Sequence, residues 1–258
     1  MLNVLMLGDI VGSPGRKIIK QQLSQIKKDY DIEFTIANAE NAAGGRGLTE
    51  EVMHELVMDG IDVMTMGNHT WDNKNIFSFI DYEHRILRPA NYPAPCPGRG
   101  YHIYTAGIDH RIAVINLAGR IFMQPLDCPF QALEEILLEI GSTADSIVVD
   151  FHAEATSEKL ALARHFDGRV TAVLGTHTHI QTSDEQIMPG GTAYITDLGM
   201  TGPIDSILGM NKDQVIDKIF YQRPVRLEVA KGAAQLQGVV LVINAQYMAE
   251  KIIRLSVA

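Results

Sequence analysis

Cysteine is scarce in this chain of 258 residues. Its two cysteines, Cys96 and Cys128, lie far apart, and neither belongs to a C-x-x-C motif. Disulfide frameworks and thiolate zinc sites need more cysteines at closer spacing. The sequence therefore indicates neither, and we expect both thiols to be buried or idle.

Long apolar runs are missing as well. Stretches such as residues 238–243 fall far short of the ~20 residues that a membrane span needs. The N-terminal sequence MLNVLMLGDIVG has no basic leader and no small-residue cleavage site. We expect a soluble, cytoplasmic protein with no membrane partner.

The chain also lacks an excess of basic residues. It has 22 Lys and Arg against 31 Asp and Glu, a formal net charge of −9. Proteins that coat nucleic acid by counterion release need a basic face, so no stable nucleic-acid binding is expected. An anionic substrate remains compatible with this charge if carboxylates hold divalent cations, because the local charge is then positive.

Short β-rich runs alternate with amphipathic helical stretches, a rhythm typical of βαβ units and a mostly parallel sheet. Strands are predicted at residues 2–7, 33–37, 63–66, 101–105, 111–117, 146–150, 170–174, 186–188 and 192–196. Helices are predicted at residues 17–28, 49–58, 73–82, 130–140 and 157–165. The tail, residues 225–257, reads as strands around a polar turn.

This order of elements predicts an α/β fold of two packed mixed sheets with helices outside. One stretch resembles a linker, and it contains Pro89, Pro93, Pro95 and Pro97. We see no repeat and no low-complexity segment, and we therefore expect one domain over residues 1–258.

Polar side chains follow five of the predicted strands at the point where each strand ends. They are Asp9, Glu40, Asn41, Asn68, His69, His152, His177 and His179. Each has an ordinary explanation taken singly: an Asp as a turn former or helix cap, an Asn- and Gly-rich segment as a plain loop, a lone His as a structural residue. Ligands collect at the carboxyl ends of strands in open α/β folds, so their joint occurrence indicates a site.

His177 and His179 flank one threonine directly after an apolar run. Residues i and i+2 of an extended chain share a face, so the two imidazoles are predicted to converge. Together with the carboxylates and amides they form a nitrogen and oxygen ligand set without thiolate, which suits Mn, Fe or Zn. The set is too large for one tetrahedral ion, whereas two ions ~3.5 to 4 Å apart, bridged by a carboxylate, would use it fully.

The motifs, taken in order, resemble the calcineurin-like metallophosphoesterase superfamily. GD after the first strand, an acidic residue after the second, GNH after the third, a separate His and then GTHTH follow its order across nearly the whole chain. Two motifs differ from the common form, because Val11 stands where a first His is usual and the second motif reads AENAAGG. The segments GDIVG, ENAAGG, GNHTWD, DFHAEATSEK and GTHTHIQTSDEQI resemble the YmdB-like branch, phosphodiesterases that act on 2',3'-cyclic nucleotides.

This resemblance implies a four-layer α/β/β/α metallophosphoesterase domain with two metal ions per chain, iron or manganese before zinc. One ion would be held by Asp9, Glu40, Asn41 and His179, and the other by Glu40 as the bridge, Asn68, His152 and His177. In-line attack by a metal-bridging hydroxide would open the cyclic phosphate, and His69 would be the acid that protonates the leaving oxygen. Asn41 would supply a neutral oxygen in place of the missing first-motif His.

Several alternatives stay open at this stage. A phosphomonoesterase or nucleotidase on the same scaffold is one, and a non-enzymatic regulatory or RNA-associated binding protein is another. A binuclear amidohydrolase also uses H-x-H, but there the pair follows the first strand. Arg46 is expected to face solvent or to contact an anion, and Asp72, Asp150 and Asp197 are candidates for orienting ligand imidazoles. The substrate is expected to be a small cyclic nucleotide or other phosphoester, and the enzyme a homo-oligomer.

Overall fold

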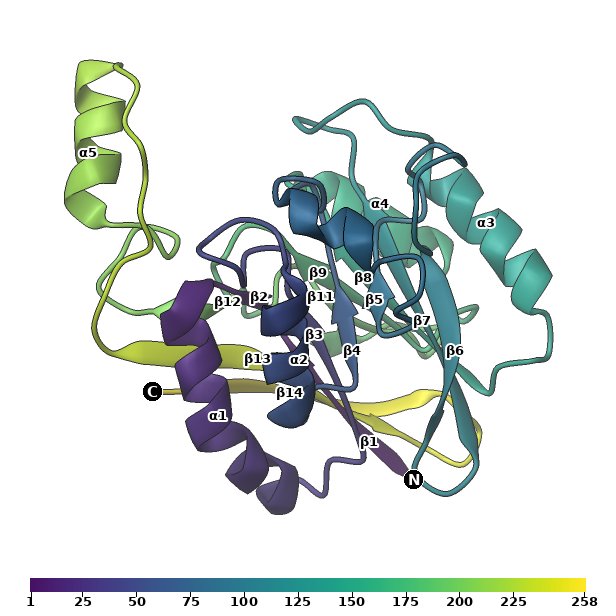
Figure 1. Cartoon of the computed structure of the whole chain (residues 1–258). Coiled ribbons are helices and arrows are strands. Elements are labelled where there is room, and N and C mark those ends of the chain that lie inside the picture. The colour runs from purple at the N-terminus through teal and green to yellow at the C-terminus, as the bar shows by residue number, and fades with distance from the viewer.

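Two mixed β-sheets lie face to face between two layers of helices in the computed structural model, which describes residues 1–258 (Figure 1). The eight-stranded sheet contains β1 (Leu2–Leu7), β2 (Asp9–Ile10), β3 (Phe34–Asn38), β4 (Val63–Thr65), β5 (Ile86–Leu87), β12 (Met200–Pro203), β13 (Ala234–Ile243) and β14 (Ala249–Val257). The six-stranded sheet contains β6 (Tyr101–Ala106), β7 (His110–Ala118), β8 (Ser146–His152), β9 (Ala172–Thr176), β10 (Gln186–Ile187) and β11 (Ala193–Ile195). The predicted four-layer α/β/β/α fold is confirmed.

Five α-helices and one 3-10 helix accompany the sheets. They are α1 (Gly12–Asp29), α2 (Glu50–Met58), η1 (Lys74–Ser78), α3 (Pro129–Ile140), α4 (Thr156–His165) and α5 (Lys212–Tyr221). The helices α1 and α2 cover the outer face of the eight-stranded sheet, and α3 and α4 cover the outer face of the six-stranded sheet (Figure 1). None of the helices is both long enough and apolar enough to cross a membrane.

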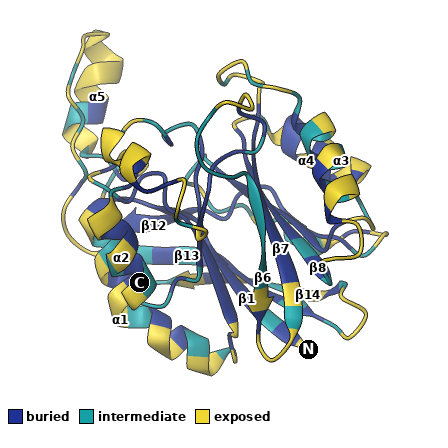
Figure 2. Ribbon diagram, turned by 45° about the vertical axis from the view of Figure 1, so that its right-hand side comes forward, coloured by how far each residue is buried: buried dark blue, intermediate teal, exposed yellow.

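Alternation along the strands creates three separate cores. In β1, Leu5 and Leu7 pack under α1 and α2, whereas Val4 and Met6 face the other sheet. Successive side chains of a strand point to opposite faces, so a strand that is apolar throughout is buried on both. The buried residues in Figure 2 accordingly lie along the strands and the inner faces of the helices.

Strand direction brings the predicted site residues to one end of the molecule. The strands β1, β3, β4 and β5 are parallel neighbours in one sheet, and β7, β8, β9 and β11 are parallel neighbours in the other. Their carboxyl ends carry the polar residues that follow each strand. The site therefore forms where the ends of both sheets meet.

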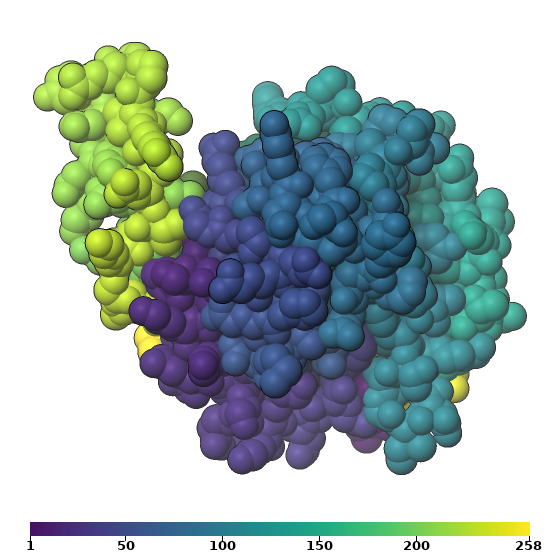
Figure 3. All heavy atoms as spheres, in the orientation of Figure 1, coloured from purple at the N-terminus to yellow at the C-terminus, as the bar shows by residue number.

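The structure differs from the prediction in one helix, and it adds α5 and the short strands β2, β5 and β12, which were not predicted. The helix expected at residues 73–82 is only the 3-10 helix η1, since Asn73 accepts a hydrogen bond from the Asn75 amide and its polar neighbours compete for backbone groups. The helix α5 was not predicted, although Asn211 caps it by accepting from the Asp213 and Gln214 amides. It stands away from the body of the protein, and only Val215 in it is buried (Figure 3).

Candidate metal centre

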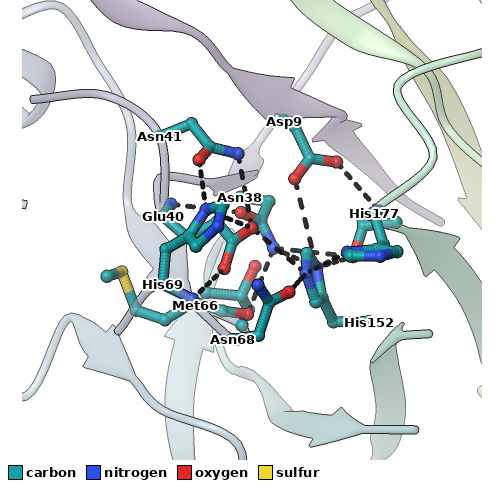
Figure 4. Close-up of polar contacts among 12 residues, drawn as sticks. Asp9, Asn38, Glu40, Asn41, Met66, Asn68, His69, His152 and His177 are labelled. Atoms are coloured by element: carbon teal, nitrogen blue, oxygen red, sulfur yellow. Dashed lines mark hydrogen bonds and ion pairs between the residues drawn. The ribbon is translucent and has the colours of Figure 1, made fainter. Parts of the chain in front are cut away.

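His152 is the centre of one group of donor atoms. It is fully buried at the end of β8, and its Nε2 lies 3.0 Å from Asn68 Oδ1, 3.0 Å from His177 Nδ1 and 3.1 Å from Glu40 Oε1 (Figure 4). Two ligand atoms that are each ~2.1 Å from the same ion lie roughly 3 to 3.4 Å apart. The spacing of these four side chains therefore fits one cation.

A second group of donors lies beside the first. His179 Nε2 is 3.7 Å from Asp9 Oδ1 and 3.3 Å from Asn41 Nδ2, and this same amide nitrogen is 3.3 Å from Glu40 Oε1. Glu40 thus touches both groups, as a bridging carboxylate must. The amide oxygen of Asn41 faces His69, so coordination by Asn41 requires its amide to turn over.

Asp9 provides a direct test of whether this site suits a cation. Its side chain is fully buried, and Oδ2 accepts a hydrogen bond from the His177 amide at 3.1 Å. Its other oxygen, Oδ1, is buried with no hydrogen-bond partner. A buried carboxylate oxygen is costly unless it is paired or coordinates a metal. A cation between the donor groups would supply the missing partner, and the nitrogen and oxygen donors suit a borderline or hard metal ion.

The two central imidazoles differ in charge. Burial, helped by the neighbouring His152, lowers the pKa of His177 to about 3, so its ring is neutral and keeps a lone pair for coordination. Burial also opposes charge on His152, but Glu40, Asp9 and Asp150 outweigh it and raise the pKa of His152 to about 9. A metal ion would have to displace this proton, because coordination needs the neutral ring.

The backbone of the H-x-H pair is not extended as the sequence suggested. The strand β9 ends at Thr176, and His177 and His179 have φ angles of 107° and 65°. They reach the site from a loop and face different donors, His177 toward His152 and His179 toward Asp9. The predicted shared strand face is therefore wrong, although the two imidazoles do lie in one site.

His69 lies on a turn after β4. Its amide donates to Glu40 Oε2 at 2.8 Å, and its ring Nδ1 lies 2.7 Å from Asn41 Oδ1. The side chain is 25 % exposed. The ring is therefore held at the rim of the donor groups and stays accessible.

Asp150 supports His152 through a threonine hydroxyl. Thr176 Oγ1 donates to Asp150 Oδ1 at 2.7 Å and lies 2.9 Å from His152 Nδ1. Burial, partly offset by His152, raises the pKa of Asp150 to about 6. This chain of contacts fixes the ring so that Nε2 faces the donors.

Asp72 and Arg46 do not join the donor groups. Arg46 Nη1 is 3.4 Å from Asp72 Oδ2, and the arginine side chain is 65 % exposed. The two form a surface ion pair above the site loop. Asp197, the remaining candidate, is buried beneath the H-x-H loop.

Two residues near the site were missed by sequence reasoning. Glu154 Oε2 lies 3.1 Å from His177 Nε2. Asn38 accepts from the Glu40 amide, and its Nδ2 lies 3.2 Å from Asp150 Oδ2. An asparagine at the last position of a short, mainly apolar strand, as Asn38 is in β3, is a signal that was available.

Comparison with known proteins shows close relatives over nearly the whole chain. The family model of the YmdB-like proteins matches residues 5–255. A 2',3'-cyclic-nucleotide 2'-phosphodiesterase of Bacillus subtilis is 51% identical over 245 residues, which cover 95% of this chain and 92% of the relative. The crystal structure of a hypothetical protein from Thermus thermophilus has a TM-score of 0.94 at 38% identity and covers 99% of this chain and 98% of that one. A novel phosphatase from Mycoplasma pneumoniae also gives a TM-score of 0.94, at 36% identity, covering 99% of this chain and 93% of that one.

Proposed function

This chain belongs to the YmdB-like family, and from that premise we propose that it is a dinuclear-metal phosphodiesterase that hydrolyses 2',3'-cyclic nucleotides to 3'-nucleotides. The activity of the Bacillus subtilis relative supports this substrate class. The observation that carries the proposal is the buried, unpartnered Oδ1 of Asp9 beside two groups of nitrogen and oxygen donors. A cation-binding centre explains it.

We propose that each metal ion is held by one donor group. Asp9, Asn41 and His179 would hold the first, Asn68, His152 and His177 the second, and Glu40 both. When bound, such ions lower the pKa of water and offset the charge of a phosphate. Iron or manganese suits this donor set best, and zinc is the third candidate.

His69 is proposed as the acid of the reaction. Hydrolysis adds the elements of water across the bond between phosphorus and the 2'-oxygen, and this oxygen leaves as a strong base that needs a proton. His69 Nδ1 lies 2.7 Å from Asn41 Oδ1, and once this amide has turned over to coordinate, its NH2 group would face Nδ1 and place the ring proton on Nε2, which is left for the substrate. A positioned proton donor contributes about 10² to 10⁴-fold in rate.

A phosphatase acting on monoesters is the second candidate, because the similar Mycoplasma pneumoniae structure is described as a phosphatase. The deciding experiment combines elemental analysis with a substrate panel of 2',3'-cyclic AMP, a linear phosphodiester and a phosphomonoester. We expect two ions per chain and fastest turnover of the cyclic substrate, with 3'-AMP as product. Preference for the monoester would overturn the diesterase, and metal binding without turnover of any ester would favour a binding protein.

We propose further that residues 1–258 act as one metallophosphoesterase domain, because both sheets contribute donors to one centre. The cytoplasm is the proposed compartment, which suits a chain whose Cys96 and Cys128 are both free thiols. Self-association is proposed through α5. This helix has ten residues, too few to be stable alone in water, and its exposed Ile216, Ile219 and Phe220 need a cover.

A second copy of the chain is the cover we propose for α5. The helix buries only Val215 against its own chain, and a second copy is always present in equal amount. The charged residues around the apolar face are of both signs, with Asp217 beside Lys218, which suits a self-complementary contact better than a strongly charged ligand.

A further inference from the structure

A buried ion pair lies directly beneath the loop that carries His177 and His179. Lys159, in the first turn of α4, and Asp197, after β11, are both fully buried, and their Nζ and Oδ2 atoms are 2.9 Å apart. From the sequence, Asp197 was only a candidate for orienting ligand imidazoles, and Lys159 had no assigned role. Neither residue faces the donor atoms of the metal centre.

The pair contacts the peptide units on both sides of His177. Lys159 Nζ donates to the carbonyl oxygen of Thr176 at 2.8 Å, and the amide of Thr178 donates to Asp197 Oδ2 at 2.9 Å. The peptide oxygen before His177 and the peptide nitrogen after it are thus bound to the two halves of one ion pair.

The backbone at this place needs such support. His177 and His179 adopt positive φ angles, a region that residues with a Cβ atom rarely occupy. A residue in such a conformation persists only where its surroundings over-determine it. Within this loop, the positive φ angles belong to the two histidines that face the proposed metal ions.

Gly175 in the neighbouring strand β9 leaves space for the ion pair. A Cβ atom added to Gly175 would lie 1.8 Å from the carbonyl oxygen of Thr196 and 3.1 Å from Lys159 Cδ. Glycine at this position therefore lets the lysine stem and the chain before Asp197 pass close to β9. Asp197 Oδ1 also accepts from the Gly199 amide at 2.9 Å, which fixes the carboxylate.

A contribution to folding stability does not by itself explain why Lys159 and Asp197 form a buried ion pair. Replacing a buried ion pair by apolar residues of similar volume is often neutral or stabilising. A lysine in the first turn of a helix also has the wrong charge for the helix dipole. The contacts to Thr176 and Thr178 give the pair a different role.

We propose that Lys159 and Asp197 form a positioning pair, which holds the H-x-H loop in its strained conformation so that His177 and His179 present their nitrogens to the metal ions. This inference rests on the proposed function for the metal centre but not on the substrate. Partners that orient metal ligands typically change metal affinity about 10- to 100-fold when they are mutated. The effect is expected on metal binding by a protein that remains folded.

The test measures Mn²⁺ affinity by chelator competition, together with Tm and far-UV circular dichroism. The variants are Lys159→Met and the double variant Lys159→Met/Asp197→Leu, which replaces the pair by apolar groups. Arg88→Met is the matched control, because Arg88 is a buried cation that bonds only to carbonyl oxygens away from the loop, including Pro89 O and Pro97 O. Both pair variants should lose about 10- to 100-fold in Mn²⁺ affinity while folded, and Arg88→Met should lose stability without that loss.

Wild-type Mn²⁺ affinity in folded Lys159→Met would overturn the inference. Recovery of both Tm and Mn²⁺ affinity in the double variant would also overturn it. In that case each residue of the pair would be needed only to neutralise the buried charge of the other. If Lys159→Met does not fold, the affinity of the double variant, which leaves no buried unpaired charge, decides between the two outcomes. A wild-type protein that binds Mn²⁺ but cleaves no cyclic nucleotide would sink the proposed function and leave this inference standing.

Discussion

Asp9 and His177, 168 positions apart in the sequence, are joined by a hydrogen bond of 3.1 Å from the His177 amide to Asp9 Oδ2. The bond connects Asp9, at the start of β2 in one sheet, to His177, directly after β9 in the other. It also leaves Asp9 Oδ1 as the buried oxygen without a partner. The proposed metal centre therefore lies across the contact between the two sheets.

Asp9→Asn tests this interpretation of the unpaired oxygen. The amide keeps an acceptor for the His177 amide but removes the charge, so we expect one of two ions to be lost while the metal-free protein is at least as stable as wild type. Elemental analysis gives the ions per chain, and thermal unfolding with and without a chelator gives the two stabilities. Two ions retained in the variant would remove Asp9 from the site.

His69→Ala tests the division between ligands and acid. The variant should lose about 10² to 10⁴-fold in turnover of 2',3'-cyclic AMP, because the leaving oxygen has no proton donor, and should keep its metal. The control is His54→Ala, which truncates a histidine of α2 whose side chain is 64 % exposed. This variant should keep both its turnover of 2',3'-cyclic AMP and its metal. Loss of metal from His69→Ala would make His69 a ligand instead.

Glu154→Gln tests how His177 is oriented. Glu154 Oε2 lies 3.1 Å from His177 Nε2, so the carboxylate holds the proton on Nε2 and leaves the Nδ1 lone pair facing His152 and the metal. Because Glu154 is 50 % exposed, we expect a loss of about tenfold in Mn²⁺ affinity, at the lower end of the usual range.

The control for that variant is Glu51→Gln, on an exposed position of α2 away from the site. It should leave Mn²⁺ affinity unchanged. Equal affinities in Glu154→Gln and wild type, measured by the same chelator competition, would mean that His177 is oriented by its loop alone.

Local patterns were enough to predict most of the strands and the residues that follow them, although not the short strands β2, β5 and β12. An apolar run such as β9 and the polar residues after it are properties of adjacent positions, and parallel strand ends meet by topology. The φ angles of His177 and His179 were not predictable, because no glycine or asparagine marks them and the conformation depends on Lys159 and Asp197, which are distant in sequence. The role of Glu154 depends on the same loop and was missed for the same reason.

The helix α5 escaped prediction for a related physical reason. Its apolar residues, such as Ile216 and Phe220, recur at helical spacing, but they are exposed rather than packed on the body of the chain, so the pattern does not relate the helix to this core. Figure 2 shows α5 as largely exposed. The sequence of a single chain does not state what covers such a face. The occupant proposed above is a second copy of the chain.

Charged substitutions on α5 test the proposed self-association. In the double variant Ile216→Asp/Phe220→Asp, two side chains that are 53% and 76% exposed would place carboxylates in the proposed contact, where burying them is costly. We expect the variant to be monomeric by light scattering, whereas wild type is an oligomer. The control is Leu138→Asp, which puts a carboxylate at an equally exposed apolar position of α3 and should leave the oligomer intact.

The same variant shows whether the interface and the metal centre are linked. His179 Nδ1 lies 3.0 Å from the carbonyl oxygen of Leu208, in the segment that leads to α5. If association steadies this segment, the monomeric variant should bind Mn²⁺ more weakly than wild type, because His179 loses a fixed partner. A monomer with unchanged Mn²⁺ affinity would mean that metal binding does not depend on self-association. An oligomer that survives the substitutions would place the interface elsewhere on the molecule.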